Sequence, residues 1–479
     1  MKREELFDAL QDLDDKKILA ARDDVKKKNP VWTRWMALVA CAAIIVGVLL
    51  GSPILKGGNV EKYPSGIVTV QAKYPEATAV NLSAQQFMES DAHWDWWKTY
   101  RELAEASGKL QGDMSYYYMD IMERILISED DNTVCSPLNT YVAFAMLAEV
   151  TDGNSRQQIL DMLHITDIET LRENIKTLWE GNYVDTPTLK SLLANSIWLR
   201  EGVSYDQDTL TRLAHQYYAS TFSGDPGSKE MSEALRIWTD KNTGGLLTEY
   251  TKDMKLDSST VMALVSTIYY KAQWVDKFWA QNTKPEAFHG TKGDTTVDMM
   301  HLTDTYAVYN ADQFISLGLS LTDSGAMYFY LPKDGIDVNA LASDPEILQA
   351  TRFDPDNGSW SSPLVHLSVP KFNVSGKTDL IEILNKLGLT DILDPSLSDF
   401  TPLTKEMNDL FLSTANHTAM VEIDEDGVTG AAYTELAIPE SAALPDDEID
   451  FVLDRPFMFV VTGSDGSVLF SGIVRNIES

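Results

Sequence analysis

An α+β fold is predicted for this chain, because helical and strand patterns alternate along it without the strand–helix–strand rhythm of a parallel sheet. Apolar residues recur at helical spacing in 142–149, 171–180, 208–219 and 379–388. Short apolar or alternating runs typical of strands occupy 194–199, 264–270, 326–331, 364–369, 410–415, 457–462 and 468–474. The 479 residues are 44% hydrophobic, so the chain can bury a sizeable core.

The N-terminal region contains one apolar run that is long enough to cross a membrane. Residues 35–55 form 21 consecutive positions without a charge, close to the roughly 20 that a spanning helix needs. A basic cluster at 26–34 precedes the run, so the positive-inside rule keeps residues 1–34 in the cytoplasm. We therefore expect a single-pass anchor in the cell membrane, with everything after it extracellular. The alternative is a cleaved signal, which would leave a secreted protein.

Residues 56–112 are expected to form an extracellular linker that includes an aromatic-rich helix. The part up to Ser83 is rich in Gly, Pro, Ala and Thr and lacks periodicity, which is typical of a spacer. The stretch His93–Tyr100 is unusually aromatic. It is either a helix packed on the side of the main domain or a platform that binds sugar or cell wall. The main domain is placed at 113–479, with its first helix near Met114–Leu126.

The chain is strongly acidic, with a net charge of −33 from 39 basic and 72 acidic residues. Affinity for phosphate depends on clusters of lysine and arginine, so binding to nucleic acid is not expected. Of the two cysteines, Cys41 lies in the apolar run and Cys135 in an expected core strand. We therefore expect no disulfide.

The sequence contains none of the motifs that mark common catalytic or metal sites. Its seven histidines do not occur in the spacing of zinc sites, and there is no Cys-x-x-Cys pair. A nucleophile elbow, a phosphate loop and a dinucleotide fingerprint are also missing. We therefore expect no enzyme activity, no metal and no cofactor. His417, on an expected strand between Phe411 and Met420, is interpreted as a core histidine.

The most informative segment is Glu425–Thr434, which is built almost entirely from small side chains. Alternate residues of a strand line one face. The residues of one parity are Val428, Gly430, Ala432 and Thr434, and those of the other are Thr429, Ala431 and Tyr433. As a strand, the segment would turn only small side chains to one side. Such a pattern suits a strand that slides into an existing sheet above a packed core.

Several further motifs, in a consistent order and spacing, carry a resemblance to a known family. They are Asn132–Leu138, Asp152–Ile159, Ala194–Trp198, Trp238–Leu247, Ile268–Lys271, Val297–Met300, Pro370–Phe372, Asp454–Phe459 and Ser467–Gly472. Together they cover roughly residues 114–477, and the chain resembles the serpins, inhibitors of serine proteases. The resemblance implies a central mixed β-sheet, two smaller sheets, about eight or nine helices and an exposed reactive loop. A lone N-terminal anchor without disulfides points to a bacterial type.

The resemblance also implies a mechanism, in which a serine protease is trapped as a covalent acyl-enzyme when the cleaved loop inserts into the central sheet. The hinge of this loop matches Glu425, Gly427, Val428, Thr429, Gly430, Ala431, Ala432 and Thr434. Lys371, beside Trp274, matches the partner of Glu425 in an ion pair that anchors the hinge. Heparin-activated members need a basic helix, and Leu171–Glu180 offers no basic cluster. We therefore expect no heparin-like cofactor, and we expect a monomer.

Four residues match the region where the central sheet must part, namely Ser136, Asn139, Ser266 and His417. The chain departs from the family at two of them: Asn139 stands where a serine is usual, and Ser266 where an asparagine is usual. An amide offers an acceptor and two donors, whereas a hydroxyl offers one O–H. If the two side chains touch, the exchange conserves their hydrogen bonding. We therefore expect Asn139 and Ser266 to approach each other.

Family spacing from Glu425 places the cleaved bond at Ser441–Ala442, with Ala443 or Leu444 as alternatives. The segment 437–445 contains neither Arg nor Lys. A trypsin-like pocket needs a cationic partner, so the expected targets are elastase-like or subtilisin-like proteases. Two other functions stay open: a non-inhibitory serpin that acts as a carrier or chaperone, and a cell-surface protein that binds through the Trp-rich segment. The small hinge residues favour an inhibitor.

Overall fold

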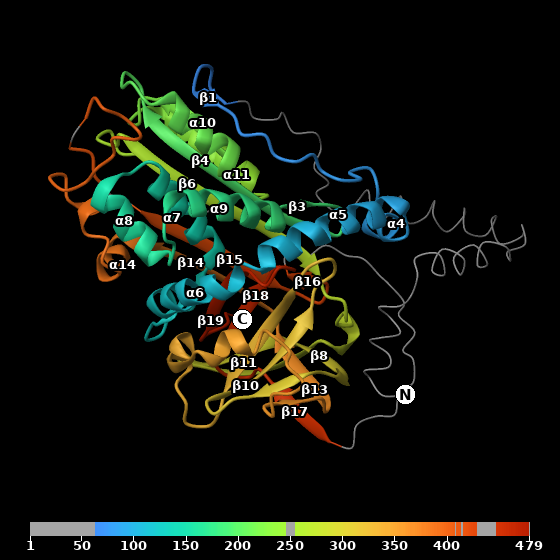
Figure 1. Ribbon diagram of the computed structural model, residues 1–479. Coiled ribbons are helices and arrows are strands. Elements are labelled where there is room, and N and C mark those ends of the chain that lie inside the picture. The colour runs from blue at the N-terminus through green and yellow to red at the C-terminus, as the bar shows by residue number, and fades with distance from the viewer. Residues whose placement is uncertain (1–62, 246–253, 408, 413–414, 429–446, 479) are drawn as a thin grey trace, which may run out of the picture. The chain divides into compact units, whose positions relative to one another are not determined.

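The structure, a computed structural model, describes residues 63–245, 254–407, 409–412, 415–428 and 447–478 (Figure 1). Its helices are α4 (Ala84–Met88), α5 (Asp91–Gly108), α6 (Gln111–Leu126), α7 (Pro137–Glu149), α8 (Gly153–Met162), α9 (Ile168–Asn182), α10 (Gln207–Gln216), α11 (Lys229–Asn242), α13 (Glu346–Gln349) and α14 (Leu380–Lys386). Short 3-10 helices occupy Ala280–Asn282, Val338–Ser343 and Asp391–Leu393.

The largest sheet of the described residues is mixed. Its strand order is β1 (Val68–Val70), β5 (Ala219–Gly224), β4 (Leu189–Arg200), β6 (Met262–Gln273), β16 (Gly427–Val428), β15 (Asn416–Ile423) and β14 (Phe372–Asp379), and β3 (Val184–Asp185) also pairs with β4. Strand β4 is parallel to β5 but antiparallel to β6. The prediction of a central mixed sheet is therefore confirmed.

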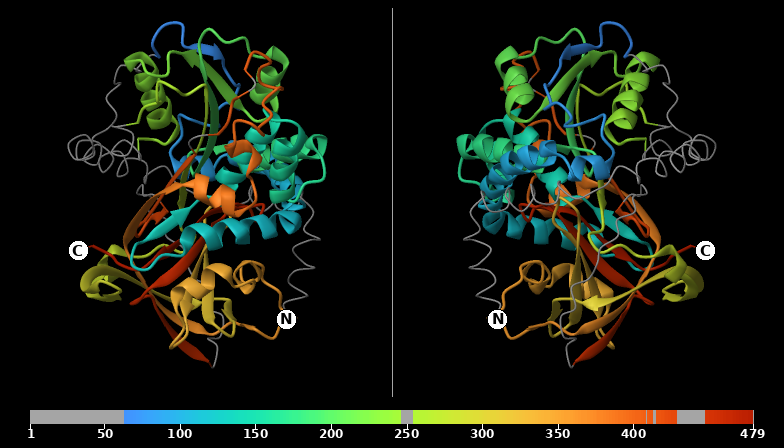
Figure 2. Two further views of the ribbon diagram at one scale, coloured as in Figure 1. Left: turned by 90° about the vertical axis from the view of Figure 1, so that its left-hand side faces the viewer. Right: turned by 90° about the vertical axis from the view of Figure 1, so that its right-hand side faces the viewer.

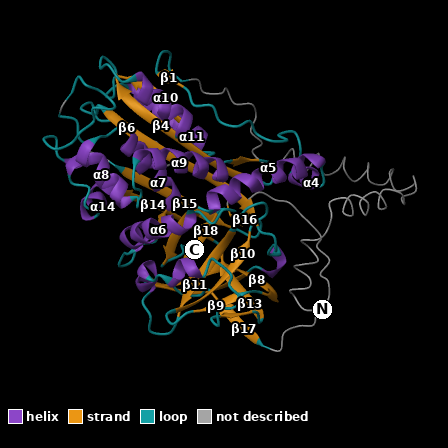
Figure 3. Cartoon of the chain, viewed as in Figure 1, coloured by secondary structure: helices purple, strands orange, loops and turns teal. Residues whose placement is uncertain are grey.

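Two smaller sheets complete the α+β architecture. One has the order β12 (Trp360–Ser361), β9 (Val308–Asn310), β10 (Phe314–Ser320), β11 (Ala326–Pro332), β18 (Phe457–Thr462), β19 (Val468–Val474) and β2 (Thr133–Cys135). The other has the order β17 (Glu448–Val452), β13 (Leu364–Pro370), β8 (Gly293–Thr305) and β7 (Lys284–Gly290). Figure 3 shows most helices around the central sheet, with the smaller sheets below.

Helix α7 lies in the core, in contact with both β6 and β19. All its residues except Ala143 are buried, as expected for a helix without a polar face. Ser136 caps it by accepting a hydrogen bond from the backbone N–H of Asn139 (3.4 Å), and Pro137 follows at the first helical position. The Ser-Pro motif thus starts a helix whose N-terminus is held at the central sheet.

Strands β4 and β6 make apolar contacts on both faces of the sheet. Side chains of alternate residues belong to different clusters, one on each face. Ala194, Trp198 and Val265 pack in one cluster with the apolar side of α11. Leu193 and Ile268, of opposite parity, pack in the main core, to which α7 and α9 also contribute. Because residues i and i+2 share a face, these contacts establish which face of β6 looks toward the main core.

The segment before the main domain belongs to the folded body. Strand β1, blue in Figure 2, pairs antiparallel with β5 and is the outermost strand on that side of the central sheet, and the neighbouring Ile67 and Ala72 are buried. The expected spacer therefore does not extend through residues 67–72. The prediction failed there because a short extended segment without periodicity can still add to a sheet edge.

The aromatic stretch His93–Tyr100 lies in α5, which packs on α9. The two helices approach closely, since a Cβ on Gly181 would lie 2.5 Å from the Cβ of Ser107. Of the two interpretations of this stretch, the contact supports a helix packed on the side of the domain.

One predicted strand is wrong, and one prediction lies outside the described residues. No strand occupies 409–412 or residue 415, and β15 begins at Asn416 instead. Leu410 is buried but Phe411 is 45% exposed, so the described part of this apolar run is an irregular, partly buried connection rather than a strand. No helix in the described part of the chain is both long and apolar enough to span a bilayer. The anchor expected at 35–55 falls outside that part.

Candidate functional site

A tight turn joins β15 to β16 and begins the candidate hinge. The carboxylate of Asp424 accepts hydrogen bonds from the N–H groups of Asp426 (2.9 Å) and Gly427 (3.2 Å). The N–H of Asp424 donates to the carbonyl of Gly427 (3.1 Å). Strand β16 then lies between β15 and β6, with Val428 opposite Ile423 on one side and Ala272 on the other. The chain therefore enters the central sheet directly after the turn.

Gly427 and Val428 leave no spare room in the sheet. A Cβ on Gly427 would lie 2.1 Å from the carbonyl oxygen of Ala272 and 2.8 Å from the Cα of Gln273, so only glycine fits. Val428 is 1% exposed and belongs to the main core cluster together with Ala272 and Ile423. The face toward which Val428 points is therefore the core face of the sheet.

Glu425 is held by two partners from different elements. Its carboxylate forms an ion pair with the ammonium of Lys371 (3.1 Å) and accepts a hydrogen bond from the hydroxyl of Thr283 (2.8 Å). Partial burial alone would raise the pKa of Glu425. Hydrogen bonds from its own backbone N–H, from Thr283 and from Lys371 outweigh that effect and hold the pKa below its ordinary value. The expected pairing of Lys371 with Glu425 is thus present.

Trp274 holds the turn in place with two hydrogen bonds. Its indole N–H donates to the carbonyl of Asp424 (2.9 Å), and its backbone N–H donates to the carbonyl of Asp426 (3.1 Å). The side chain is almost fully buried. Sequence reasoning did not assign roles to Asp424 or Thr283, although an Asp three residues before a Gly is a signal for such a turn.

The two strands that flank β16, namely β6 and β15, are not paired with each other in the described part of the chain. Among the described residues, β6 pairs with β4 and β16, and β15 pairs with β14 and β16, but no register joins β6 to β15. Most side chains of β6 are only half-buried, whereas most of those of β4 are buried. Within the described residues, β6 and β15 are therefore joined only through the two residues of β16, and Gly427 and Val428 cap the opening between them.

His417, on β15, is bonded to the cap of α7. The backbone N–H of Ser136 donates to Nε2 of His417 (2.9 Å). Burial lowers the pKa of His417 to about 4, because desolvation disfavours the charged imidazolium. The histidine is therefore neutral near pH 7, which leaves Nε2 free to accept this bond. The two predicted residues Ser136 and His417 are in direct contact.

The predicted approach of Asn139 to Ser266 is also present. The amide N–H of Asn139 donates to the carbonyl of Ser266 (3.1 Å), and the hydroxyl of Ser266 is bonded to the amide oxygen of Asn139. That hydroxyl also lies 2.7 Å from the amide oxygen of Asn195 on β4. Asn195 in turn donates to the carbonyl of Tyr217 (2.7 Å). Asn195 was noted only as part of a family motif, and its position in this network was missed.

The N-terminus of α7 therefore touches both sides of the opening. Ser136 reaches β15 through His417, and Asn139 reaches β6 through Ser266. Any separation of β6 from β15 must strain or break one of these two contacts.

The remaining predicted residues lie outside the described part of the chain. They are Thr429, Gly430, Ala431, Ala432 and Thr434 of the hinge, and Ser441, Ala442, Ala443 and Leu444 around the expected cleaved bond. The chain continues in β17, which is parallel to β13. Within the described residues, no group of three or more His, Cys, Asp or Glu side chains could hold a metal ion. Burial raises the pKa of the Cys135 thiol far above its usual range.

Known proteins share this architecture. Serpin-ZX of Arabidopsis thaliana is 29% identical over 368 residues, which cover 73% of this chain and 93% of Serpin-ZX. The native crystal structure of tengpin, a thermophilic serpin, is similar with a TM-score of 0.67 at 23% identity, covering 76% of this chain and 93% of tengpin. Human thyroxine-binding globulin has a TM-score of 0.66 at 23% identity, covering 80% of this chain and all of that one. At 23% identity, the likeness to these two structures is evidence for the fold alone.

The family model described as Serpin (serine protease inhibitor) matches residues 116–477, which is most of the chain. The match spans all three sheets except β1, together with the hinge and the opening beneath it. The chain belongs to the serpin family.

Proposed function

We propose that this serpin is inhibitory and traps a serine protease by insertion of its cleaved loop. The catalytic serine of the protease attacks a loop bond and forms an acyl-enzyme ester. Before that ester is hydrolysed, the freed loop adds to the central sheet as a new strand and releases stored strain. Residues 428–441 number 14, so the inserted strand spans about 45 Å, and the protease is carried that far and distorted.

The observation that carries this proposal is that β6 and β15, in the part of the chain that the structure describes, are joined only by the two residues of β16 at the start of the loop. A strand placed there would pair with the backbone groups along both edges. Val428 points toward the core, so Gly430, Ala432 and Thr434 would follow it to the same face. Their small side chains suit insertion over a core that is already packed.

A non-inhibitory carrier is the second candidate within the family. It draws support from the likeness to thyroxine-binding globulin, whose name indicates a hormone carrier, but that likeness concerns only the fold. The hinge composition favours inhibition, because no residue of the Val428 parity up to Thr434 is charged or bulky. In a serpin whose loop does not insert into the sheet, nothing physical requires small side chains at these positions.

The proposed targets are elastase-like and subtilisin-like serine proteases. Ser441, Ala442 and Ala443 suit a small neutral specificity pocket, and Leu444 suits a larger apolar one. Pro445 after Leu444 disfavours cleavage there, which makes Ser441–Ala442 the preferred bond.

We place the inhibitor outside the cell, tethered by residues 35–55, and external protease treatment of intact cells would test this by releasing the serpin domain.

The decisive experiment mixes the full chain separately with an elastase, subtilisin and trypsin, followed by denaturing electrophoresis. We expect a covalent complex with elastase or subtilisin and none with trypsin. Mass spectrometry of the released C-terminal fragment should place its first residue within 440–446. Rapid trapping of trypsin, or a cut elsewhere, would overturn the assigned specificity. Cleavage by every protease without a stable complex would favour the carrier.

A further inference from the structure

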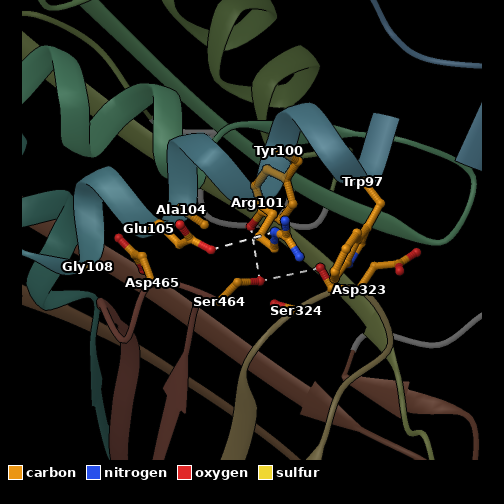
Figure 4. Close-up of a pocket in the computed structure, with 10 residues that line it drawn as sticks. All are labelled: Trp97, Tyr100, Arg101, Ala104, Glu105, Gly108, Asp323, Ser324, Ser464 and Asp465. Carbon is orange, nitrogen blue, oxygen red and sulfur yellow. Dashed lines mark hydrogen bonds and ion pairs between the residues drawn. The ribbon is translucent and has the colours of Figure 1, made fainter. Parts of the chain in front are cut away.

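A cavity of about 440 Å³ lies between α5 and two turns of the second sheet (Figure 4). Trp97, Arg101 and Glu105 of α5 line one side. Asp323 of the β10–β11 turn and Ser464 of the β18–β19 turn line the other. Helix α5 precedes residue 116, where the family match begins. One wall of the cavity is therefore formed by residues outside the matched region, and the hinge and opening do not contribute to it.

The floor of the cavity is held rigidly. The two carboxylate oxygens of Asp323 are bonded to His93 Nε2 (2.8 Å) and to the hydroxyl of Thr188 (2.6 Å). The hydroxyl of Tyr100 donates to that of Ser464 (3.1 Å). These bonds engage side chains far apart in the sequence, so the polar groups on the floor are preorganised.

Asp465, at the inner end of the cavity, has its charge satisfied by the protein. Its carboxylate accepts hydrogen bonds from Ser107 (2.5 Å), Asn182 (2.8 Å) and Ser467 (2.6 Å). It is buried and joins α5 and α9 to the β18–β19 turn. The carboxylates of Asp323 and Asp465 thus serve as structural anchors and leave little charge for a ligand.

The outer wall, in contrast, can adapt. Arg101 and Glu105 form a 3.6 Å ion pair with side chains 55% and 67% exposed. An exposed pair of this kind contributes little to stability, so both groups can turn toward a ligand at small cost. The guanidinium of Arg101 lies 4.9 Å from the ring centre of Trp97. Trp94, half exposed, stacks on Trp97 with ring centres 5.9 Å apart.

We propose that this cavity binds a neutral saccharide of one or two rings. When the exposed Arg101 side chain turns off the ring of Trp97, the apolar face of a pyranose can stack there, while its hydroxyls donate to Glu105 and accept from Arg101. Ser464 offers a further hydroxyl on the floor. The cavity volume lies within the roughly 300–1,000 Å³ of small-molecule sites.

The charges in the cavity argue for neutrality. The adaptable groups are one cation, Arg101, and one anion, Glu105, which cancel. An acidic sugar would face the carboxylate of Glu105, and a basic one would displace Arg101 from its partner. A neutral, hydroxyl-rich ring satisfies donors and acceptors together without leaving a charge unpaired.

The test measures binding to the full chain by calorimetry and by saturation-transfer NMR. The probes are cellobiose, maltose and N,N′-diacetylchitobiose, with glucuronic acid and glucosamine as charged counterparts. We expect at least one neutral disaccharide to bind, and Trp97→Ala to weaken that binding by about tenfold or more, because it removes the stacking surface. Trp97→Phe should restore part of it. Trp279→Ala, which removes an exposed tryptophan outside the cavity, should bind as the parent does.

Folding is checked by the melting temperature of each variant. Should Trp97→Ala lower it, Arg101→Gln provides a second test on an exposed side chain, and we expect it also to weaken binding. The proposal is overturned if no neutral disaccharide binds the parent, if the charged sugars bind more tightly, or if both Trp97→Ala and Arg101→Gln bind as the parent does. Protease trapping should be unchanged in Trp97→Ala, so the outcome does not depend on the inhibitory function.

Discussion

Strand β6 has two edges that differ in how far they are paired. On one edge, eleven residue pairs join it to β4, from Leu199 opposite Met262 to Leu189 opposite Ala272. On the other edge, within the described residues, pairing is limited to Gly427 and Val428 of β16. One edge is therefore complete, while the other presents backbone groups that a new strand could bond. Within the described residues, the difference places room for another inner strand along this edge of β6.

The contacts around the unpaired edge differ in kind from those along the paired one. Backbone ladder bonds hold β6 to β4. At the opening, the hinge is instead held by the ion pair of Glu425 with Lys371. Further along, two hydrogen bonds connect the start of α7 to the flanking strands, one between Ser136 and His417 of β15 and one between Asn139 and Ser266 of β6. A few side-chain contacts can be broken in turn more readily than a ladder, which is what a sheet that must part requires.

The largest expected effect comes from a matched pair of substitutions in the loop. Ala432→Arg, of the Val428 parity, would place an unpaired charge over the core during insertion, at a cost of several kcal/mol. It should turn the inhibitor into a substrate and lower the yield of covalent complex by about 100-fold. Ala431→Arg makes the same chemical change on the opposite face and should keep most trapping. Equal loss in both variants would show that the insertion register is wrong.

Cleavage of the loop should raise the melting temperature, because the inserted strand would pair the open edge of β6. We expect an increase on the order of 10 °C, as several kcal/mol produce in a domain of this size. Calorimetry of intact and cleaved protein provides the measurement. A cleaved form that melts no higher than the intact one would mean that the edge stays unpaired and would support the carrier.

The Ser136–His417 contact should make the stability depend on pH. The native pKa of His417 is about 4, against 6.5 in the unfolded chain, so below pH 6.5 the unfolded state binds a proton that the native state does not. The contribution of His417 to the free energy of unfolding is complete above pH 6.5. It is lost as the pH falls toward 4, by roughly 3 kcal/mol in total. Chemical denaturation of the parent and of His417→Gln, whose amide can accept the same bond without titrating, should differ by this amount. Parallel pH profiles would contradict the assigned role.

The smallest expected effect concerns the exchanged pair under the opening. Asn139→Ser and Ser266→Asn should each reduce the free energy of unfolding by about 1–3 kcal/mol, because each leaves a buried polar group without its partner. The double variant, which restores the usual family arrangement, should recover most of the loss. Additive losses in the double variant would show that the two residues do not compensate each other.

Much of the paired region could be predicted from sequence, and less of the open one. Strands β4 and β6 carry long apolar runs whose side chains serve two covered faces, so their pattern is strong. The Asn139–Ser266 contact was predictable because two departures from a family pattern were reciprocal. Sequence could not reveal that Val428 is already paired in the sheet, since its entry depends on the Asp424 turn and on the absence of a Cβ at Gly427, which would lie 2.1 Å from the carbonyl oxygen of Ala272.

The N-terminal segment shows a second limit. An aromatic-rich helix was expected around His93–Tyr100, and α5 forms there, with the rings of Trp96 and Tyr100 stacked one helical turn apart. Strand β1 was missed because its stability comes from β5, more than 140 residues later in the chain, and nothing in its own sequence records that partner. The run at 410–415 was assigned to a strand on composition alone, which cannot separate an irregular apolar connection from a strand.

The most direct test is residue-resolved hydrogen exchange of β6 before and after loop cleavage. The amide groups of β6 that bond β4 serve as an internal control and should exchange equally slowly in both forms. The alternate amide groups, which face β15, should exchange quickly in the intact protein below Ala272 and become protected by about 100-fold or more once the loop pairs with them. If these groups exchange at the same rate in intact and cleaved protein, the open edge of β6 does not receive the loop.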